Sequence, residues 1–311
     1  METRIKIANP IYDVVFRYLM EDNEVAKLLL STIIGEEIEE LIFQPTSHSR
    51  KIGSGDSITV IRMDFSARIK QANGKEKLIL IELQKAKFYY QTMRFRRYLG
   101  KQYQNPENKD KKENALPIYP IYILGDAFSE KKAPVIKVAR NYIDLATEEI
   151  IQEKHPFIEA LTHDAMVIQI PYLTDRRRTE LERFLSIFDQ SLQVDTKGHV
   201  LALNEEDYPN SYHTVIRRLN KALQSPDIEE DMDMEDEVIN EFNKQAEIIQ
   251  DIKEQVERAE REKEEAEQRA KEEKQRVKQL VQQLHALGQG VTQIAKVSGL
   301  EREEIQRILG K

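Results

Sequence analysis

The chain has 311 residues, with 47 Lys or Arg against 55 Asp or Glu, so that its formal net charge is −8. This length allows one or two domains, and the 33% of charged residues exceeds the roughly 25% of an average globular chain. The absence of cysteine excludes disulfides, Cys-ligated zinc, iron–sulfur clusters and thiol nucleophiles. Neither an apolar signal-peptide region nor an 18-residue apolar stretch is present, so we expect a cytoplasmic protein without membrane segments.

The excess negative charge is confined to one segment. From Asp227 to His285 there are 10 basic and 20 acidic residues, a net of −10, whereas residues 1–226 (33 and 32) and 286–311 (4 and 3) carry +1 each. The negative net charge of the whole chain therefore does not exclude nucleic-acid binding by residues 1–226, because binding depends on the local electrostatic field. We expect a domain over residues 1–226 with its core at about 5–190, an acidic linker and helix over 227–287, and a helical hairpin over 288–311.

The sequence of residues 1–226 predicts a mixed α/β fold. Hydrophobic periodicity and turn residues mark its elements. The expected elements are helix 13–33, strand 39–43, strand 57–70, an Asn73-Gly74 turn, strand 77–84, helix 88–104, strand 116–124, strand 165–172 and helix 179–190. Strand 77–84 is apolar enough to be central. Pro120 favours an edge or a bulge for strand 116–124, and residues 191–226 give no firm assignment.

A seven-residue repeat holds from Phe242 to Leu287 and predicts a coiled coil that joins two chains. The alternative is a single charged helix held by i,i+4 ion pairs, because the middle of the repeat offers mostly alanine. The two columns are Phe242, Ile249, Val256, Lys263, Ala270, Val277, Leu284 and Gln245, Ile252, Ala259, Ala266, Glu273, Leu280, Leu287.

The last stretch predicts two short helices, residues 291–297 and 301–309, around a Ser298-Gly299-Leu300 turn. Their apolar positions would close a small core of Ile294, Leu300, Ile305 and Ile308. The spacing is like that of a helix-turn-helix. The second helix, however, opens with acidic residues that oppose phosphate approach, which favours a structural cap or a dimer element over DNA reading.

Two carboxylates on the predicted hairpin suggest a metal site. Asp64 lies in one strand and Glu82 in the next, and pairing across the Asn73-Gly74 turn would place them side by side. Carboxylate oxygens suit Mg²⁺ or Mn²⁺, and such an ion can orient a water and stabilise charge on a phosphodiester. Gln84 lies on the same strand face as Glu82. A carboxylate in the middle of a strand needs a charged or hydrogen-bonding partner, so a purely structural role is harder to explain for Asp64 and Glu82 than a role in metal binding.

Basic and aromatic residues follow directly after this hairpin. Between Lys85 and Lys112 there are nine basic residues against two acids, with six aromatic residues interleaved. This composition suits a nucleic acid. The alternative is that the arginines pair with core acids and the tyrosines pack. The candidate nucleic-acid-binding residues are Lys85, Lys87, Arg94, Arg97, Tyr98 and Lys101.

The Asp64…Glu82-Leu83-Gln84 arrangement resembles the PD-(D/E)XK nuclease core, and more narrowly the PD-(D/E)XK nuclease-family transposases, the recombination-promoting nuclease group. The stretches NPIYDVVFRYLM, RMDFSARIK and IELQKAKFYYQTMRFRRYLGKQY add to the resemblance, which covers about residues 5–125. It implies a restriction-endonuclease-like mixed sheet flanked by helices and a metal-dependent endonuclease, for which DNA is the favoured substrate and RNA stays an alternative.

Carried over residue by residue, the resemblance makes Asp64 and Glu82 the Mg²⁺ or Mn²⁺ ligands and Asp13 a supplementary acid. Gln84 stands where a Lys is usual, and an amide cannot take a proton or carry a cation. The group commonly has Gln at this position, so Gln84 is compatible with activity and leaves the question open. Two alternatives stay open: a catalytically inactive nuclease fold that binds nucleic acid, and a coiled-coil assembly protein. Asp13 is also a candidate N-cap of its own helix.

Overall fold

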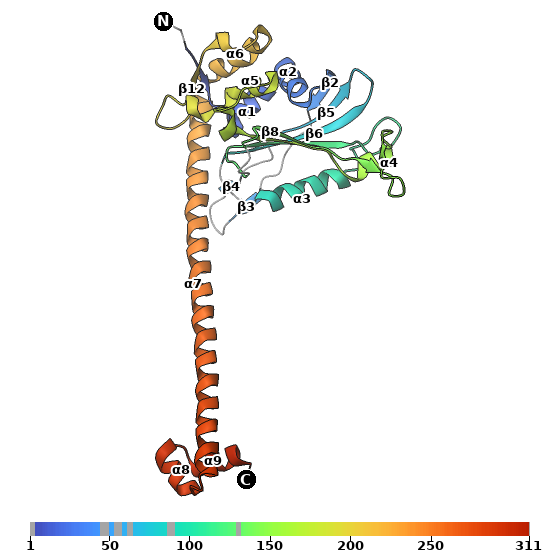
Figure 1. Cartoon of the computed structure of the whole chain (residues 1–311). Helices are drawn as coiled ribbons and strands as arrows, with labels where there is room; N and C mark the ends of the chain where they lie inside the picture. Colours follow the sequence, from blue (N-terminus) through green and yellow to red (C-terminus); the bar gives the residue numbers. More distant parts are fainter. Residues whose placement is uncertain are drawn as a thin grey trace. The chain divides into compact units, whose positions relative to one another are not determined.

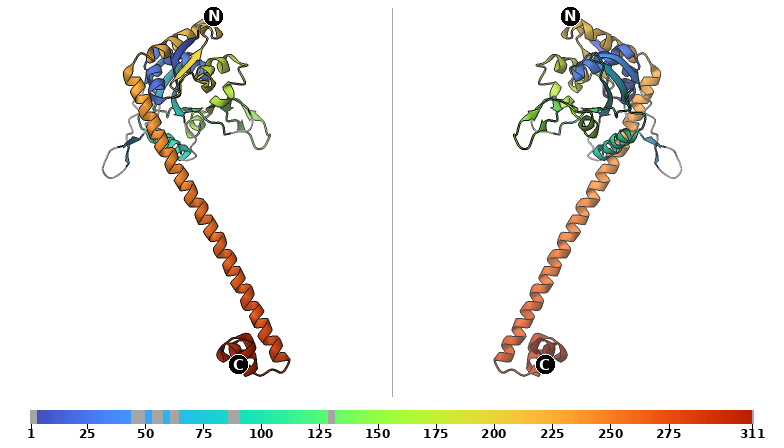
Figure 2. Two further views of the ribbon diagram at one scale, coloured as in Figure 1. Left: turned by 90° about the vertical axis from the view of Figure 1, so that its left-hand side faces the viewer. Right: turned by 90° about the vertical axis from the view of Figure 1, so that its right-hand side faces the viewer.

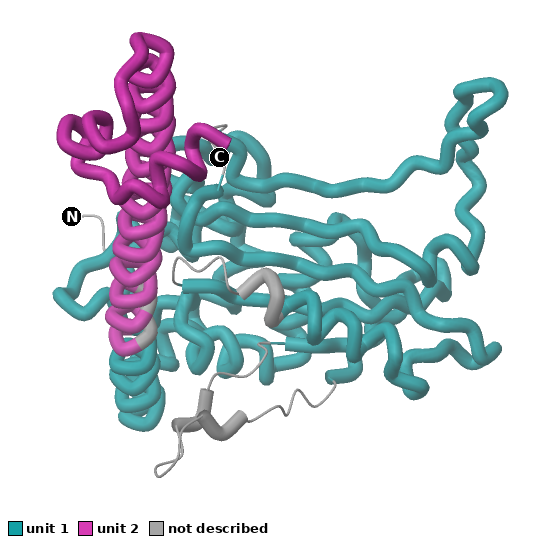
Figure 3. Tube along the Cα trace, turned by 90° about the horizontal axis from the view of Figure 1, so that it is seen from below, with its two compact units in different colours: residues 1–239 teal, residues 240–311 magenta. Residues whose placement is uncertain are grey.

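The computed structural model describes residues 4–43, 50–52, 58–60, 65–85, 91–128 and 132–310. They divide into two units, residues 1–239 and 240–311, which are coloured separately in Figure 3. The boundary between the units falls inside a helix, 13 residues beyond the expected domain end at 226.

A six-stranded mixed sheet forms the centre of the first unit (Figure 1). The first three strands in space are antiparallel neighbours, the next two run parallel to the third, and the last is antiparallel. In spatial order they are β2 (Ile38–Phe43), β5 (Phe65–Gln71), β6 (Glu76–Gln84), β7 (Ile118–Leu124), β11 (Ala165–Gln169) and β8 (Val135–Val138). The mixed α/β class predicted from the sequence is therefore confirmed.

The β5–β6 hairpin turns where the Asn73-Gly74 signal predicts it. Gly74 has a φ of +77°, a conformation that glycine adopts without strain. The register pairs Lys70 with Glu76 and Phe65 with Ile81. β6 has a strand on each side and its central residues are buried, so the expectation of a central strand is also confirmed.

β7 also lies inside the sheet, between β6 and β11, so the edge position suggested by Pro120 is wrong. The ladder with β6 begins at Ile118, but the ladder with β11 begins only at Ile121. Pro120 therefore precedes the part of β7 that is paired on both sides. Its missing N–H costs no hydrogen bond to β11, because the ladder with β11 begins only after it.

Helices cover both faces of the sheet (Figure 1). α3 (Gln91–Gln104) connects the parallel strands β6 and β7 and packs on one face, where Phe95, Tyr98 and Leu99 cluster with Leu78 and Leu80. The other face carries the larger core of the unit. Its helices are α1 (Asp13–Met20), α2 (Asn23–Ile34), α5 (Glu180–Leu185) and α6 (His213–Ala222).

The single helix expected over 13–33 is two helices. Asp22 ends the first and caps the second, because its side chain accepts the N–H groups of Glu24 and Val25. Of the expected strand 57–70, the described residues form β4 (Ile58–Val60) and β5. The expected strand 165–172 continues after β11 as a 3-10 turn, Ile170–Leu173.

Smaller elements complete the first unit. β1 (Ile5–Ala8) pairs with β12 (Val200–Leu203), which belongs to the stretch that the sequence left unassigned. The remaining elements are β3 (Arg50–Ile52) paired with β4, β9 (Tyr142–Ile143) paired with β10 (Ile150–Ile151), α4 (Pro156–Leu161), and 3-10 turns at Ser186–Phe188, Gln190–Leu192, Glu205–Asp207 and Asn210–Tyr212.

α7 (Pro226–Ala286) is one continuous helix of 61 residues, as both views in Figure 2 show. The acidic run that was expected to be a linker is therefore helical from its first residue. Pro226 suits the first helical position, where its missing N–H has no intrahelical partner to lose. Ile228 and Met232, one turn apart on this segment, are buried in the main core, which is why the acidic run is ordered.

The second unit ends in the expected hairpin, α8 (Val291–Ser298) and α9 (Arg302–Leu309), joined through Gly299 with a φ of +69°. Ile294 and Ile305 are fully buried, and Leu300 and Ile308 pack against them, which confirms the predicted core. Val281 of α7 is fully buried in the same cluster, so the hairpin packs on the last turns of its own helix.

Candidate functional site

Glu82 is buried near the end of β6, with 2% of its surface exposed. It lies opposite Tyr122 in the parallel ladder with β7. Burial, together with the charge of Glu82, raises the pKa of the Tyr122 hydroxyl above its ordinary value. The Tyr122 ring packs 4.4 Å from that of Phe95 on α3. Glu82 therefore belongs to the sheet face that α3 covers.

Gln84 lies two residues further along and shares this face, whereas Lys85 follows it at the end of the strand. The backbone here is fixed by β7, because Gly125 donates its N–H to the Gln84 carbonyl at 2.7 Å. A Cβ at Gly125 would stand 2.7 Å from the Lys85 carbonyl oxygen. Only glycine allows this approach, so the end of β6 is held tightly against the end of β7.

Asp13 occupies the first turn of α1, on the other face of the sheet. Its carboxylate accepts from Arg17 one turn later. The N-cap position belongs to Tyr12, whose side chain makes no capping bond, so the alternative in which Asp13 caps the helix is wrong.

The cap comes instead from α7. Glu235 accepts the N–H of Val14 with Oε1 at 2.8 Å and the N–H of Asp13 with Oε2 at 3.0 Å. These amides have no partner inside the helix, and a carboxylate also complements the positive end of the helix dipole. A residue more than 200 positions away thus completes the first turn of α1.

Asp236, the next residue, joins three further side chains. Its carboxylate accepts a charged hydrogen bond from Lys85, lies 2.9 Å from Nε2 of His199, and accepts the Tyr12 hydroxyl at 3.0 Å. The Lys85 ammonium also lies 3.4 Å from the centroid of the Tyr12 ring, a cation–π contact. Lys85 is therefore held on the α1 face of the sheet, as expected for the neighbour of Gln84.

The environment of these groups shifts their titration. Burial raises the pKa of Glu235 to about 7, although the Val14 amide and nearby cations oppose the shift. Burial also lowers the pKa of Lys85, against the opposing effect of Asp236. The pKa of Asp236 lies below its ordinary value because hydrogen bonds from Lys85 and His199 outweigh its partial burial.

The candidate nucleic-acid residues divide into two groups. Arg97 and Lys101, one turn apart on α3, are exposed, as is Arg96. Tyr98 is only 5% exposed and packs between α3 and the sheet, which argues against its prediction as a nucleic-acid-binding residue. The period of the helix turns this side chain inward.

Some predicted site residues fall outside the part of the chain that the structure describes. Asp64 directly precedes Phe65, the first residue of β5, and is not described, nor is Lys87. Arg94 lies within α3, but its side chain is not among those described. Among the described residues, no three His, Asp or Glu side chains come together in a way that would hold a metal ion.

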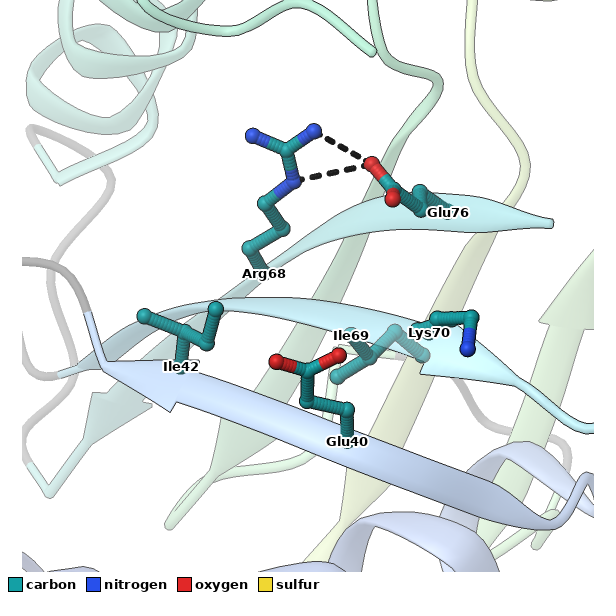
Figure 4. Close-up of a pocket in the computed structure, with 6 residues that line it drawn as sticks. All are labelled: Glu40, Ile42, Arg68, Ile69, Lys70 and Glu76. Atoms are coloured by element: carbon teal, nitrogen blue, oxygen red, sulfur yellow. Dashed lines mark hydrogen bonds and ion pairs between the residues drawn. The ribbon is translucent and has the colours of Figure 1, made fainter. Parts of the chain in front are cut away.

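A small pocket lies away from this site, over β2 and the turn end of the hairpin (Figure 4). Arg68 donates to the Glu76 carboxylate there, with Nε at 3.0 Å, and reaches the Lys109 carbonyl at 2.7 Å. Glu76 opens β6 and Glu82 stands near its end, so this ion pair ties the turn end of the hairpin and takes no part in the site.

Sequence reasoning missed Glu235, Asp236 and His199. The signal was present in the spacing of Ile228 and Met232, which gives the acidic run an apolar face at helical period. Glu235 follows Met232 by three positions and shares that face.

No family model, curated protein or solved structure matches this chain. In the described part of the chain, no helix is both long enough and apolar enough to cross a membrane.

Proposed function

We propose that this chain is a metal-dependent endonuclease that hydrolyses phosphodiester bonds, with DNA favoured, of the kind that the sequence resemblance implies. The observation that carries the proposal is the burial of the Glu82 carboxylate near the end of a central strand. A carboxylate at the end of a central strand offers oxygen ligands of the kind that Mg²⁺ and Mn²⁺ prefer. The six-stranded mixed sheet between helices agrees with the architecture that the resemblance implies.

The donor set fits a hard cation. Glu82 supplies carboxylate oxygens, Gln84 supplies an amide oxygen on the same strand face, and Asp64 adds the second carboxylate in this proposal. When bound, Mg²⁺ or Mn²⁺ would polarise the phosphodiester and lower the pKa of an attacking water. Gln84 can orient a water or a phosphate oxygen through its amide, but it cannot take up the proton.

Nucleic acid is the partner that the surface of α3 favours. Arg96, Arg97 and Lys101 are exposed, and no acidic residue occurs within α3. Guanidinium and ammonium groups on one side of a helix bind the phosphate backbone without regard to sequence. We therefore place the DNA along α3, next to the face that carries Glu82.

We propose further that two chains associate through α7. Ile249, Ile252, Val256 and Leu280 of the predicted repeat are 41–54% exposed in the single chain. An apolar stripe of this length is covered in a coiled-coil dimer. Arg258, Arg261 and Arg269 each pair with a Glu four residues earlier, which supports the helix whether or not it has a partner.

Gln84 favours a second candidate function, a nucleic-acid-binding protein with the same fold and no hydrolysis. Metal titration separates the two. Calorimetric titration of Mn²⁺ into the full chain should show one site that is lost in Glu82→Ala and retained in Glu76→Ala, which changes a carboxylate of the same strand. Equal Mn²⁺ binding by the wild type and Glu82→Ala would contradict the proposed metal site.

A further inference from the structure

We propose that Glu235 and Asp236 are positioning residues of the site, so that the base of α7 is an integral part of the catalytic domain. This inference rests on the proposed function and adds two residues to it. Glu235 holds the first turn of α1, which carries Asp13, and Asp236 holds Lys85, which follows Gln84 at the end of β6. The two adjacent carboxylates thus connect the start of α1 to the end of β6.

Buried contacts fix the segment of α7 that carries Glu235 and Asp236. Ile228 and Met232 bury their side chains in the main core on the same helical segment, with 6% and 2% exposed. His199, which lies 2.9 Å from the Asp236 carboxylate, is itself 3% exposed and belongs to the β1–β12 corner, where its carbonyl accepts the Asn9 N–H at 2.8 Å. The buried side chains of α7 and the buried His199 therefore fix the positions of Glu235 and Asp236.

Each carboxylate is the partner of polar or charged groups that would cost free energy of folding if they were left unpaired. Without Glu235, the Asp13 and Val14 amides at the start of α1 would lose their acceptor in a partly buried place. Without Asp236, the Lys85 ammonium would lose its counter-charge while it stays over the Tyr12 ring. Both losses move backbone that leads directly into site residues, and a shift of about 1 Å can lower a rate by about 100-fold.

The matched control lies on the same helix, five positions before Asp236. Asp231 is exposed, whereas Asp233 pairs with Lys197 and lies 4.0 Å from Nε2 of His199, which makes it unsuitable as a control. Asp231→Asn removes one negative charge from α7 just as Asp236→Asn does, but at an exposed position.

The test is plasmid cleavage with Mg²⁺ by the full chain. We expect Glu235→Leu to lower kcat about 100-fold with KM for the plasmid nearly unchanged. Glu235→Gln, which keeps an acceptor oxygen, should stay within a few-fold of the wild type. Asp236→Asn should lower kcat about 10-fold, and it should cost much less when Lys85→Met is already present, because Asp236 acts through Lys85. Asp231→Asn should leave both constants unchanged.

Amide hydrogen exchange supplies a readout that needs no activity. The Asp13 and Val14 amides should exchange about 10-fold faster in Glu235→Leu than in the wild type or Glu235→Gln. A wild type that cleaves, with Glu235→Leu and Asp236→Asn cleaving equally well, would overturn this inference alone, as would unchanged exchange at both amides. A wild type that cleaves nothing would instead contradict the proposed function, and the catalytic role of the pair with it.

Discussion

The carboxylate of Glu235 accepts the backbone N–H of Asp13 at 3.0 Å, although 222 positions separate the two residues in the chain. The contact makes the acidic start of α7 part of the first unit, which ends at residue 239. Burial at this position raises the pKa of Glu235 to about 7, which has a consequence for stability.

We predict that the first unit becomes less stable as the pH rises from about 4.5 to about 7. Burial raises the pKa of Glu235 from 4.5 to about 7, so in this window the folded state binds more protons than the unfolded state. Raising the pH then favours unfolding, and the stabilisation present below the unfolded pKa is lost by about 3 kcal/mol for this group.

Urea unfolding of the full chain at pH 5 and pH 7.5 measures this loss. Other groups also titrate, so the informative quantity is the difference from Glu235→Gln, which cannot titrate at this position. The wild type should lose more stability than the variant over the same interval. An identical pH dependence in the two proteins would show that Glu235 is ionised throughout.

The metal site gives the second prediction. Asp64→Ala and Glu82→Ala should each abolish cleavage, because each removes a carboxylate that the proposed cation needs. Both proteins should stay folded by circular dichroism. Glu76→Ala breaks the ion pair with Arg68 at the opposite end of β6 and should retain cleavage. Full cleavage by Asp64→Ala and Glu82→Ala would remove both residues from the site.

The third prediction concerns the exposed cations of α3. Arg97→Ala with Lys101→Ala should weaken nucleic-acid binding for all sequences and flatten the dependence of log K on log salt by about one unit per lost contact. Arg94→Ala with Arg97→Ala is expected to act in the same way. Arg217→Ala, which changes an exposed arginine on α6 paired with Glu205, is the control. An unchanged salt slope would show that DNA binds elsewhere.

Association through α7 gives the fourth prediction. Ile249→Asp with Leu280→Asp should convert dimers to monomers, because both side chains are more than 40% exposed in the single chain and belong to the predicted stripe. Light scattering should give twice the chain mass of 36.4 kDa for the wild type and for the outward-facing control Glu264→Ala. A wild type of 36.4 kDa at micromolar concentration would rule the dimer out.

Local chemistry accounts for what the sequence predicted well. The Asn73-Gly74 turn fixes the β5–β6 hairpin within a few residues, and the apolar spacing of Ile294 and Ile305 fixes the terminal hairpin. The long helix was likewise visible from its repeat. The break at Asp22 was missed because the apolar period continues through it, although the capping residue was visible.

Long-range contacts account for what was missed. The acidic run was interpreted as a linker because charge of one sign usually stays in solvent, and no local pattern reveals that Glu235 meets the start of α1. Tyr98 was predicted to bind nucleic acid, whereas packing on Leu78 and Leu80 turns it inward. The Asp64–Glu82 pairing was predicted from the hairpin alone and stays a prediction, because Asp64 lies outside the described residues and the described register ends at Phe65 and Ile81.

The central claim, that the chain hydrolyses phosphodiester bonds with a metal ion, is tested most directly by incubating the purified full chain with supercoiled plasmid and with RNA. Each substrate is combined with Mg²⁺, with Mn²⁺ or with a chelator. We predict nicking and linearisation of the plasmid with either ion, no product with the chelator, and loss of all product in Glu82→Ala. An intact plasmid and intact RNA under every metal condition, or cleavage that persists in the chelator or in Glu82→Ala, would contradict the proposal.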